Sequence, residues 1–504
     1  MRRPFKFLAA LALLLTGVLG LTRCGYLRLP GGLTVNFPGF SGDTLPDSEL
    51  RRRVTVPRGF SINTYARGIE NARLMKVTPA GDVLVSSPRT GTVWLLARDA
   101  DGDGVADGQR VLLADLYQPH GLALHDGWLY VAETTAIARV RFDAATGTVS
   151  GTPERIVSGL PDAGNHWTRT VDVGPDGKLY VSIGSSCNVC IEDDPRRAAI
   201  VRYERDGSGE QLYATGLRNA VDFEWQPGSG DLYATDNGRD LLGDDFPPCE
   251  LNRVVEGGFY GWPLANGNRV PDPDYGTGQD ARIAASIPPA HGFGAHTAPL
   301  GMTFYRRPDG AAPAAFPPSY EGVAFVALHG SWNRAKKAGY EVVAVRLDGD
   351  GGASEEPFAT GFMQDEKVYG RPVDAVVAGD GALLVSDDFT GAIYRIAYGR
   401  AATADAAPLT AAPADDPLAG LEGGVREQLH AGGALLWTAN NCAACHVAGQ
   451  AAGDAYKPLA GLSSRYTIAS LATFLRTPQA PMPVYPFSDE QRRALAVFLL
   501  QDHP

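Results

Sequence analysis

The sequence predicts a mainly β protein: a six-bladed β-propeller over residues 55–400, followed by a small all-α domain over residues 422–504. Three observations lead to this prediction. The 504 residues include 60 glycines and 36 prolines, which favour many turns over long helices. A strand-forming phrase recurs six times before residue 400, and helical periodicity is confined to the end of the chain. The length alone exceeds that of one ordinary core.

The recurring phrase is a glycine turn followed by an apolar or β-branched strand. Many copies have a further strand-like run before and after them, so the predicted unit contains three strands. Antiparallel repeats of roughly 40–50 residues are typical of a propeller. A pair of β-sandwiches is the alternative, but it would not require one phrase six times. The copies are AGDVLV (80–85), HDGWLYV (125–131), PDGKLYV (175–181), GSGDLYA (228–234), YEGVAFV (320–326) and GDGALLV (379–385).

Two segments stand apart from the repeat. FSINTYARG (60–68) could supply a strand that pairs with the last blade and closes the ring. Residues 259–300 form a long stretch rich in Gly, Pro and Asn that interrupts the rhythm. Loops of this kind on a rigid scaffold often carry binding residues.

Residues 1–25 have the layout of a secretory signal, with basic residues before an apolar run from Phe7 to Leu21. We therefore expect export to the periplasm. The run is followed by no clean small-residue cleavage site, so an uncleaved anchor and membrane association stay open. Lipidation at Cys24 is disfavoured by the bulky Arg23 before it. The net charge of −12 argues against nucleic acid as a partner.

Residues 401–421 are rich in Ala, Pro and Asp and are expected to be a linker. The domain after it contains Cys442, Cys445 and His446 in a Cys-x-x-Cys-His run, the attachment signature of haem c. A disulfide or half of a zinc site is the alternative, but no second cysteine pair follows. Met482 is the expected sixth iron ligand, against the alternative of a core methionine. Ser488 and Gln491 predict an N-cap for the last helix.

This region resembles a class I cytochrome c in the order of its helix, haem motif, Pro458, loop methionine and final helix. The resemblance implies an electron carrier. A haem accepts one electron at a time, so a two-electron substrate needs an intermediate redox cofactor. No glycine-rich dinucleotide motif follows a strand.

Separated motifs of the propeller region are informative: GNHWTRTVDVGPDGKLYVSIGSSCN (164–188), YATGLRNAVDF (213–223), ATDNGRD…CELNRVVEGGFYGWP (234–263), HTAPLGMTFY (296–305), HGSWNR (329–334) and YGRPVDAV (369–376). Together they resemble the soluble pyrroloquinoline quinone (PQQ) dehydrogenases of the glucose and L-sorbosone type. The resemblance implies a six-bladed propeller that holds PQQ and calcium on its axis and oxidises a sugar.

The same resemblance assigns residues to the PQQ site. Three carboxylates of PQQ need cationic donors, and Arg218, Asn219 and Arg371 match the family's cofactor-binding positions. Arg334 stands where the family often has lysine. His296 and Thr297 are expected at the same site, and His120 at its mouth. Surface arginines are the alternative reading.

His166 matches the family's catalytic histidine, which would accept the proton of the substrate hydroxyl. Its neighbour Asn165 departs from the acidic residue expected there, so we expect either a weaker base or an imidazole oriented by another group. A structural histidine is the alternative.

The resemblance also implies two calcium sites. The carbonyls of Gly238 and Arg239 would hold the cofactor calcium, and Glu250 with the Tyr260 carbonyl would hold a structural one. Asp99 to Asp107 alternate as in a calcium loop, but Arg110 occupies its last position, so a solvated hairpin is equally expected.

Cys187 and Cys190 lack a following histidine and favour a local disulfide in an oxidising compartment, although pairing with Cys249 stays open.

These features lead to a periplasmic quinohaemoprotein that oxidises an aldose or a sorbosone-like sugar. Its electrons would pass from PQQ through haem c to a downstream cytochrome or respiratory oxidase. Two other functions are considered: a PQQ-less carbohydrate-binding or redox-sensing propeller with an electron-relay haem, and a calcium lactonase. The arginines Arg218, Arg334 and Arg371 distinguish them, because a lactonase needs acidic and amide metal ligands instead.

Overall fold

The computed structural model describes residues 26–28, 34–36, 41–310, 312–348, 352–399, 418, 421, 423–446, 459, 462, 466, 468–475, 482, 485 and 487–503. The chain divides into two compact units, Met1–Asp405 and Ala406–Pro504. The predicted signal segment 1–25, linker residues 401–417 and Pro458 fall outside the described residues. Among the helices described, none is long and apolar enough to cross a membrane.

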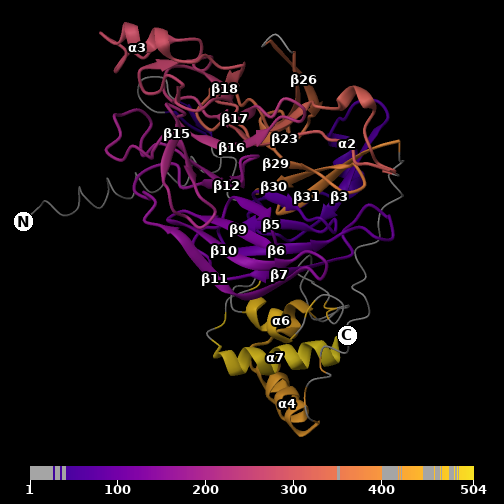
Figure 1. Ribbon diagram of the computed structural model, residues 1–504. Coiled ribbons are helices and arrows are strands. Elements are labelled where there is room, and N and C mark those ends of the chain that lie inside the picture. The colour runs from indigo at the N-terminus through magenta and orange to yellow at the C-terminus, as the bar shows by residue number, and fades with distance from the viewer. Residues whose placement is uncertain are drawn as a thin grey trace, which may run out of the picture. The chain divides into compact units, whose positions relative to one another are not determined.

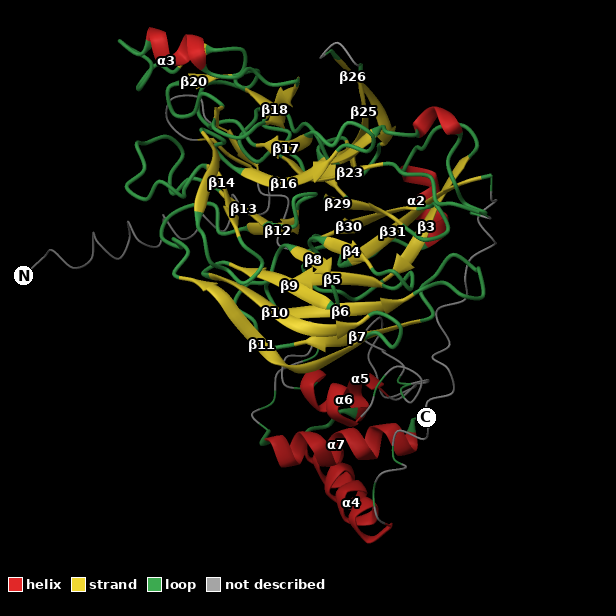
Figure 2. Ribbon diagram, viewed as in Figure 1, coloured by secondary structure: helices red, strands yellow, loops and turns green. Residues whose placement is uncertain are grey.

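The first unit is a six-bladed β-propeller, and each blade is an antiparallel four-stranded sheet (Figures 1 and 2). The first blade contains β4 Met75–Val77, β5 Val83–Ser87, β6 Thr92–Ala97 and β7 Gly108–Leu113. The second contains β8 Leu122–His125, β9 Trp128–Glu133, β10 Ala136–Asp143 and β11 Thr148–Ser158. The third contains β12 Arg169–Val173, β13 Leu179–Ile183, β14 Ala199–Tyr203 and β15 Gln211–Thr215, with the short parallel strand β19 Gly258–Phe259 added at its edge.

The remaining blades complete the ring. The fourth contains β16 Ala220–Trp225, β17 Leu232–Asp236, β18 Pro248–Val254 and β22 His291–Ala295. The fifth contains β23 Pro299–Phe304, β24 Ala324–Leu328, β25 Glu341–Leu347 and β26 Ala353–Ala359. The sixth contains β29 Pro372–Val377, β30 Leu383–Asp387, β31 Ala392–Tyr398 and β3 Phe60–Ala66. The early segment FSINTYARG therefore closes the ring as predicted, because β3 pairs antiparallel with β31.

Each recurring phrase forms the second strand of a blade, which confirms the repeat. The predicted three-strand unit is corrected to four strands. Most outer strands escaped prediction because their side chains are largely exposed and polar, as in β11 and β26. Such strands lack the apolar alternation that marks a half-buried strand in a sequence.

The blades pack face to face around the axis. Inner strands contact in the order β4, β8, β12, β16, β23 and β29, and β29 contacts β4 again. Apolar side chains from neighbouring blades form the cores between them. In one of these cores Tyr130 and Ile137 of the second blade pack with Val181 and Tyr203 of the third. A ring built this way is a rigid support for the loops at its faces.

Carboxylates satisfy the edges of the inner strands that face the axis. Asp222 accepts from the N–H of Met302 (2.9 Å) in the next blade, and Asp374 accepts from the N–H of Met75 (2.7 Å). Both carboxylates border an axial cavity of about 90 Å³. Burial raises the pKa of Asp374 to about 7. These bonds tie one inner strand to the next where no ladder partner is present.

Several short elements decorate the ring. Residues 259–300, which were expected to be a loop, contain the paired strands β20 Ala265–Asn266 and β21 Val270–Pro271, helix α3 Asp280–Ala285 and the outer strand β22. Elsewhere lie the hairpin of β1 Tyr26–Arg28 and β2 Thr34–Asn36, helix α2 Asp47–Arg53, the 3₁₀ turn η1 Pro318–Tyr320, and the pair β27 Met363–Gln364 and β28 Lys367–Val368.

The second unit is helical in its described part. It contains α4 Gly423–Ala439, α5 Ala443–His446, α6 Ile468–Phe474 and α7 Asp489–Asp502. Apolar residues of α6 and α7 form its core, with leucines of α4 packed against them. The predicted capping box is present: Ser488 accepts from the N–H of Gln491, and the Gln491 side chain accepts from the N–H of Ser488.

Candidate active site

One face of the ring gathers most of the candidate residues. In every blade the start of the inner strand and the end of the second strand lie at the same edge of the sheet. Arg73, Arg218 and Arg371 stand just before inner strands, and His329 and Asp388 just after second strands. The antiparallel topology therefore brings together residues that are far apart in the chain.

A chain of charged groups links three blades at this face. Asp388 accepts from Nη1 of Arg73 at 3.0 Å and from Nε2 of His329 at 2.9 Å. Nη2 of Arg371 bonds to Nδ1 of His329 at 2.9 Å. The side chains of Arg73, His329 and Asp388 are at most 10 % exposed. Arg73 thus contacts the carboxylate directly, and Arg371 is connected to it through His329.

The electrostatics of this network of charged groups favour the binding of an additional anion. Burial by itself would raise the pKa of Asp388, but His329, Arg73 and Arg371 hold it well below its ordinary value. Burial and the charge of Arg371 lower the pKa of His329 to about 4, which leaves that imidazole neutral. Among the described residues, Nε of Arg73 and Nε of Arg371 have no hydrogen-bond partner. Unsatisfied buried donors of this kind are uncommon and call for a ligand or water.

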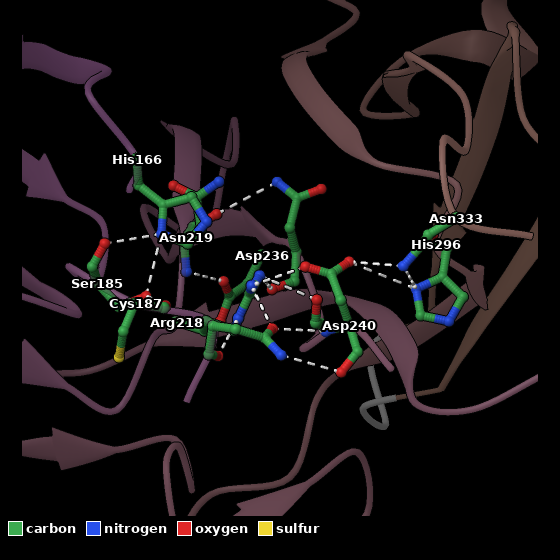
Figure 3. A network of polar contacts seen from close by, with 12 residues as sticks. His166, Ser185, Cys187, Arg218, Asn219, Asp236, Asp240, His296 and Asn333 are labelled. Carbon is green, nitrogen blue, oxygen red and sulfur yellow. Dashed lines mark hydrogen bonds and ion pairs between the residues drawn. The ribbon is translucent and has the colours of Figure 1, made fainter. Parts of the chain in front are cut away.

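His166 lies on the loop before β12 with a positive φ of 54°. Its Nδ1 is 2.8 Å from the carbonyl oxygen of Ser185 and 3.0 Å from the Ser185 hydroxyl (Figure 3). A carbonyl can only accept, so Nδ1 carries the proton and Nε2 keeps its lone pair. Burial and the charge of Arg218 lower the pKa of His166 to about 3. Ser185 thus orients the imidazole where an acidic neighbour was expected.

The loop before β14 approaches the histidine closely because of a glycine. A Cβ on Gly184 would lie 2.4 Å from Oδ1 of Asn219 and 2.6 Å from Cβ of His166. Asn219 is thereby placed beside His166. Its Oδ1 is buried and has no partner in the described part of the chain.

Arg218 is buried and satisfied by the protein itself. Its Nε donates to the carbonyl of Asn188 (2.9 Å), and its Nη1 donates to the carbonyls of Asn237 (3.1 Å) and Gly238 (3.0 Å). Its Nη2 reaches Oδ1 of Asn188 (2.9 Å) and a carboxylate oxygen of Asp240 (3.3 Å). Arg218 therefore contributes positive charge to this face, whereas its N–H donors are already used by the protein.

Asp240 joins Arg218 to the remaining candidates. Its other oxygen accepts from Nδ2 of Asn333 at 2.8 Å and lies 3.9 Å from Nδ1 of His296 (Figure 3). His296 Nε2 bonds to the Gly243 carbonyl at 2.8 Å. His296 therefore belongs to this network.

Thr297 and Arg334 lie at its border. The hydroxyl of Thr297 donates to the Gly294 carbonyl at 2.8 Å. Arg334 donates to the carbonyls of Asp244 and Ala295 and to the Asp245 carboxylate. The structure brings Arg334 next to His296 but does not join it to Arg218 or Arg371.

A second, smaller cavity lies beneath this network. It measures about 20 Å³, room for one water-sized guest, and is lined by all four predicted calcium residues: Gly238, Arg239, Glu250 and Tyr260. Asp236 lines it as well. Burial and the charge of Asp236 raise the pKa of Glu250 to about 8, and burial raises that of Asp236 to about 7. Two carboxylates facing one small cavity are suited to a divalent cation.

The structure also places the remaining candidates. His120 is fully buried and bonds to Nη2 of Arg73 at 3.3 Å, so it lies below the mouth instead of lining it.

Carboxylate oxygens of Asp99, Asp101 and Asp107 lie within 4.8 Å of one another. Cys187 and Cys190 form the predicted local disulfide, and Cys249 is a buried free thiol.

The haem motif begins beside α4 and continues through α5. Cys442 and His446 are half-buried and Cys445 is exposed. The ring of Trp437 lies 6.0 Å from that of His446. Met482 is among the half-buried side chains packed against the core of this unit. Its ligation of iron stays a prediction.

Two family models match the chain. The model described as TrAA12-like matches residues 54–246 and 264–399. The chain belongs to the TrAA12-like family. The model described as cytochrome C oxidase, cbb3-type, subunit III matches residues 428–499, so the TrAA12-like propeller is followed by a cytochrome c domain.

Related sequences cover the TrAA12-like propeller. An uncharacterized protein of Borreliella burgdorferi is 30 % identical over 376 residues, which cover 71 % of this chain and 94 % of that protein. A pyrroloquinoline quinone-dependent pyranose dehydrogenase of Coprinopsis cinerea is 24 % identical and covers 69 % of this chain. Quinoprotein glucose dehydrogenase B of Acinetobacter calcoaceticus is 24 % identical over 246 residues and covers 40 % of this chain. The matches span 55 % and 49 % of these two dehydrogenases, about half of their length.

Solved structures share the propeller fold. A calcium structure of the Trichoderma reesei carbohydrate-active enzyme of family AA12 superposes with a TM-score of 0.60 at 22 % identity, over 71 % of this chain and 99 % of that one. The holo PQQ domain of the Coprinopsis cinerea pyranose dehydrogenase gives 0.57 at 22 % identity, over 68 % and 97 %. These likenesses establish the fold of the TrAA12-like propeller.

Sequence reasoning missed several residues of the site: Arg73, Ser185, Asn188, Asp240, His329 and Asp388. Four of them follow the second strand of a blade directly or within a few residues, namely Ser185, Asp240, His329 and Asp388. The repeat itself carried this signal, because a polar residue at that place in any blade must lie on the same face.

Proposed function

We propose that the protein is an exported quinohaemoprotein that oxidises a sugar with PQQ and passes the electrons through its own haem c to a respiratory acceptor. The propeller would provide the sugar oxidation and the cytochrome c domain the one-electron transfer. Membership of the TrAA12-like family and the kinship with dehydrogenases named for PQQ support this proposal.

The observation that carries the proposal is the charge at the face of the ring. Arg73 bonds to the carboxylate of Asp388 directly and Arg371 reaches it through His329, and each arginine keeps an Nε without a partner among the described residues. Guanidinium groups bind carboxylates through charge-assisted hydrogen bonds. The site therefore fits a flat polycarboxylate such as PQQ, and Arg73 and Arg371 would hold it.

When bound, PQQ would accept the two electrons released as a substrate hydroxyl becomes a carbonyl. The protein's part in this reaction is to position the hydroxyl and remove its proton. His166 has the geometry for that role, because its Nδ1–H is fixed on Ser185, which leaves the lone pair on Nε2. Asn219, beside His166, has a buried oxygen with no partner among the residues that the structure describes, and this oxygen suits a donor group of the ligand.

Calcium would support this site from below. Asp236 and Glu250 face a cavity of about 20 Å³ that also includes Tyr260, and both carboxyls hold raised pKa values there. A divalent cation would replace the protons that such a pair retains. The cation would also hold the segment around Gly238, which contacts Arg218.

The experiment is the haem absorption spectrum of the oxidised protein, recorded before and after addition of aldoses, with and without PQQ and calcium. We expect a sugar to reduce the haem only when PQQ is present. The variant R371A should lose sugar-dependent reduction at low PQQ concentration but keep reduction of the haem by ascorbate. R346A is the matched control, since Arg346 pairs with Glu356 on an exposed strand away from the site.

Two outcomes would refute the proposal. A haem that ascorbate reduces but no sugar does, in a protein that binds no PQQ, would identify an electron-relay or binding propeller. Hydrolysis of a lactone in the presence of calcium, with no haem reduction, would identify a hydrolase.

A further inference from the structure

The disulfide between Cys187 and Cys190 closes a ring of four residues on the loop between β13 and β14. Glu192 fixes the same loop a second time: its two carboxylate oxygens accept from the backbone N–H and the hydroxyl of Ser186, both at 2.7 Å. The loop is therefore closed by a covalent bond and by a pair of hydrogen bonds. Such double closure leaves its backbone few alternative conformations.

Asn188 lies inside this ring and uses most of its hydrogen-bonding groups on the next blade. Its carbonyl accepts from Nε of Arg218 and its Oδ1 from Nη2, both at 2.9 Å. Oδ1 also accepts from the N–H of Asp240 at 2.8 Å, and Nδ2 donates to the Asp240 carbonyl at 3.1 Å. One residue thus holds a buried arginine and the loop that carries Gly238.

The other end of the loop holds the histidine. The Ser185 carbonyl and hydroxyl both contact Nδ1 of His166, and the hydroxyl donates to the Cys187 carbonyl at 2.7 Å. The hydroxyl that touches the imidazole is thereby aimed by a cysteine of the disulfide. The ring consequently reaches Arg218 through Asn188. It reaches His166 through Ser185, whose contact with the imidazole is drawn in Figure 3.

Global stability does not account for this arrangement. The loop-closure entropy that a disulfide removes from the unfolded chain grows with the length of the loop, and a ring of four residues is near the minimum. The benefit of this bond is therefore local: it fixes the two neighbours that touch His166 and Arg218.

We propose that the Cys187–Cys190 ring is the positioning element of the active site, in which Asn188 and Ser185 fix the arginine and the histidine together. This inference rests on the proposed function, since it assigns the order of the site to residues of that same face. Reduction of the disulfide by a dithiol, which is itself oxidised as both thiols form, should loosen both contacts at once.

The test compares three variants of the full chain: N188A, the double variant C187S/C190S, and V189A. Val189 lies in the same ring and is the matched control, because V189A keeps both the disulfide and Asn188. The dissociation constant of PQQ is measured by quenching of protein fluorescence. We expect N188A to weaken PQQ binding at least tenfold because it removes the Oδ1 bonds to Arg218 and Asp240. The double variant should do the same because it opens the loop that holds Asn188, and V189A should stay within about twofold.

A second readout does not depend on PQQ. Titration of the His166 imidazole, followed by NMR, should move upward in the double variant because solvent enters the site, and should not move in V189A. If the wild type binds no PQQ, the proposed function fails and this titration alone decides the inference. An unchanged titration, or PQQ binding within twofold of the wild type in both N188A and the double variant, overturns it.

Discussion

Replacement of Asp388 by asparagine tests the charge arrangement at the face of the ring. Asp388 is the shared partner of Arg73 and His329, and through His329 it also supports Arg371. The variant D388N keeps the size and one acceptor oxygen of the side chain. It removes the only negative charge in the hydrogen-bonded network of Arg73, His329, Arg371 and Asp388.

The magnitude follows from burial. The paired side chains of Arg73 and Asp388 are 7 % and 10 % exposed, so solvent screens them little. Removal of one partner from a buried pair costs about 3–5 kcal/mol, because the remaining charge is left uncompensated. The pKa of Asp388 is lowered in the folded state, so its contribution is present above its unfolded value of about 3.9 and is lost as the pH falls further. The penalty of D388N should therefore be full at pH 7 and shrink in acid.

The assay is urea unfolding of the full chain, followed by tryptophan fluorescence at pH 7 and at a pH well below the unfolded value of about 3.9. The matched control is D231N, because Asp231 pairs with Arg253 on the surface at 2.8 Å and exposed pairs contribute little. An unfolding free energy for D388N within about 1 kcal/mol of the wild type at pH 7 would refute the reasoning. Such a result would mean that water or a bound anion already compensates the arginines.

Three further predictions concern the base, the axis and the haem. H166N should lower kcat by about 10²–10⁴-fold with PQQ affinity little changed. The pH profile of kcat/KM of the wild type should show no acidic limb near pH 6.5, because burial lowers the pKa of His166 to about 3. A limb at that pH would contradict the burial of the imidazole. D374N should raise the unfolding midpoint at pH 8 but not at pH 4. A carboxyl whose folded pKa is raised to about 7 contributes its full stability only below its unfolded pKa, and it loses that contribution as the pH rises through the folded pKa. Equal midpoints of D374N and the wild type at pH 8 would argue against this. M482A should lower the haem reduction potential in a spectroelectrochemical titration, whereas M363A, in the propeller, should not; identical potentials would exclude Met482 as a ligand.

The fold was largely predictable because the repeated sequence phrase coincides with the buried second strand of each blade. The second strands are almost fully buried, so glycine turns and β-branched runs mark each blade in the sequence. The outer strands were missed for the converse reason, since β11 and β26 expose polar side chains that resemble loops. Helix α3 was missed inside 259–300 because it has only six residues and no side-chain cap.

The site was predictable in part. His166, Arg218, Asn219 and His296 lie on one face, as the motifs indicated. Asp388 and Asn188 were not found, because their roles depend on side chains from other blades. A sequence shows which residues are near a strand end but not which partners meet them across the ring. Packing of separate blades, which local patterns do not encode, decides those contacts.

The closure of the propeller by β3 has a consequence for how the chain folds. β3 ends at Ala66, and its partner β31 begins at Ala392, roughly 330 residues later. Until β31 has been synthesised, β3 cannot occupy its place, and the sixth blade cannot form. During that interval the apolar faces of the first and fifth blades that pack against the sixth stay exposed and can associate with other chains. The cytochrome segment follows directly in the sequence, so its synthesis begins just as the ring becomes able to close.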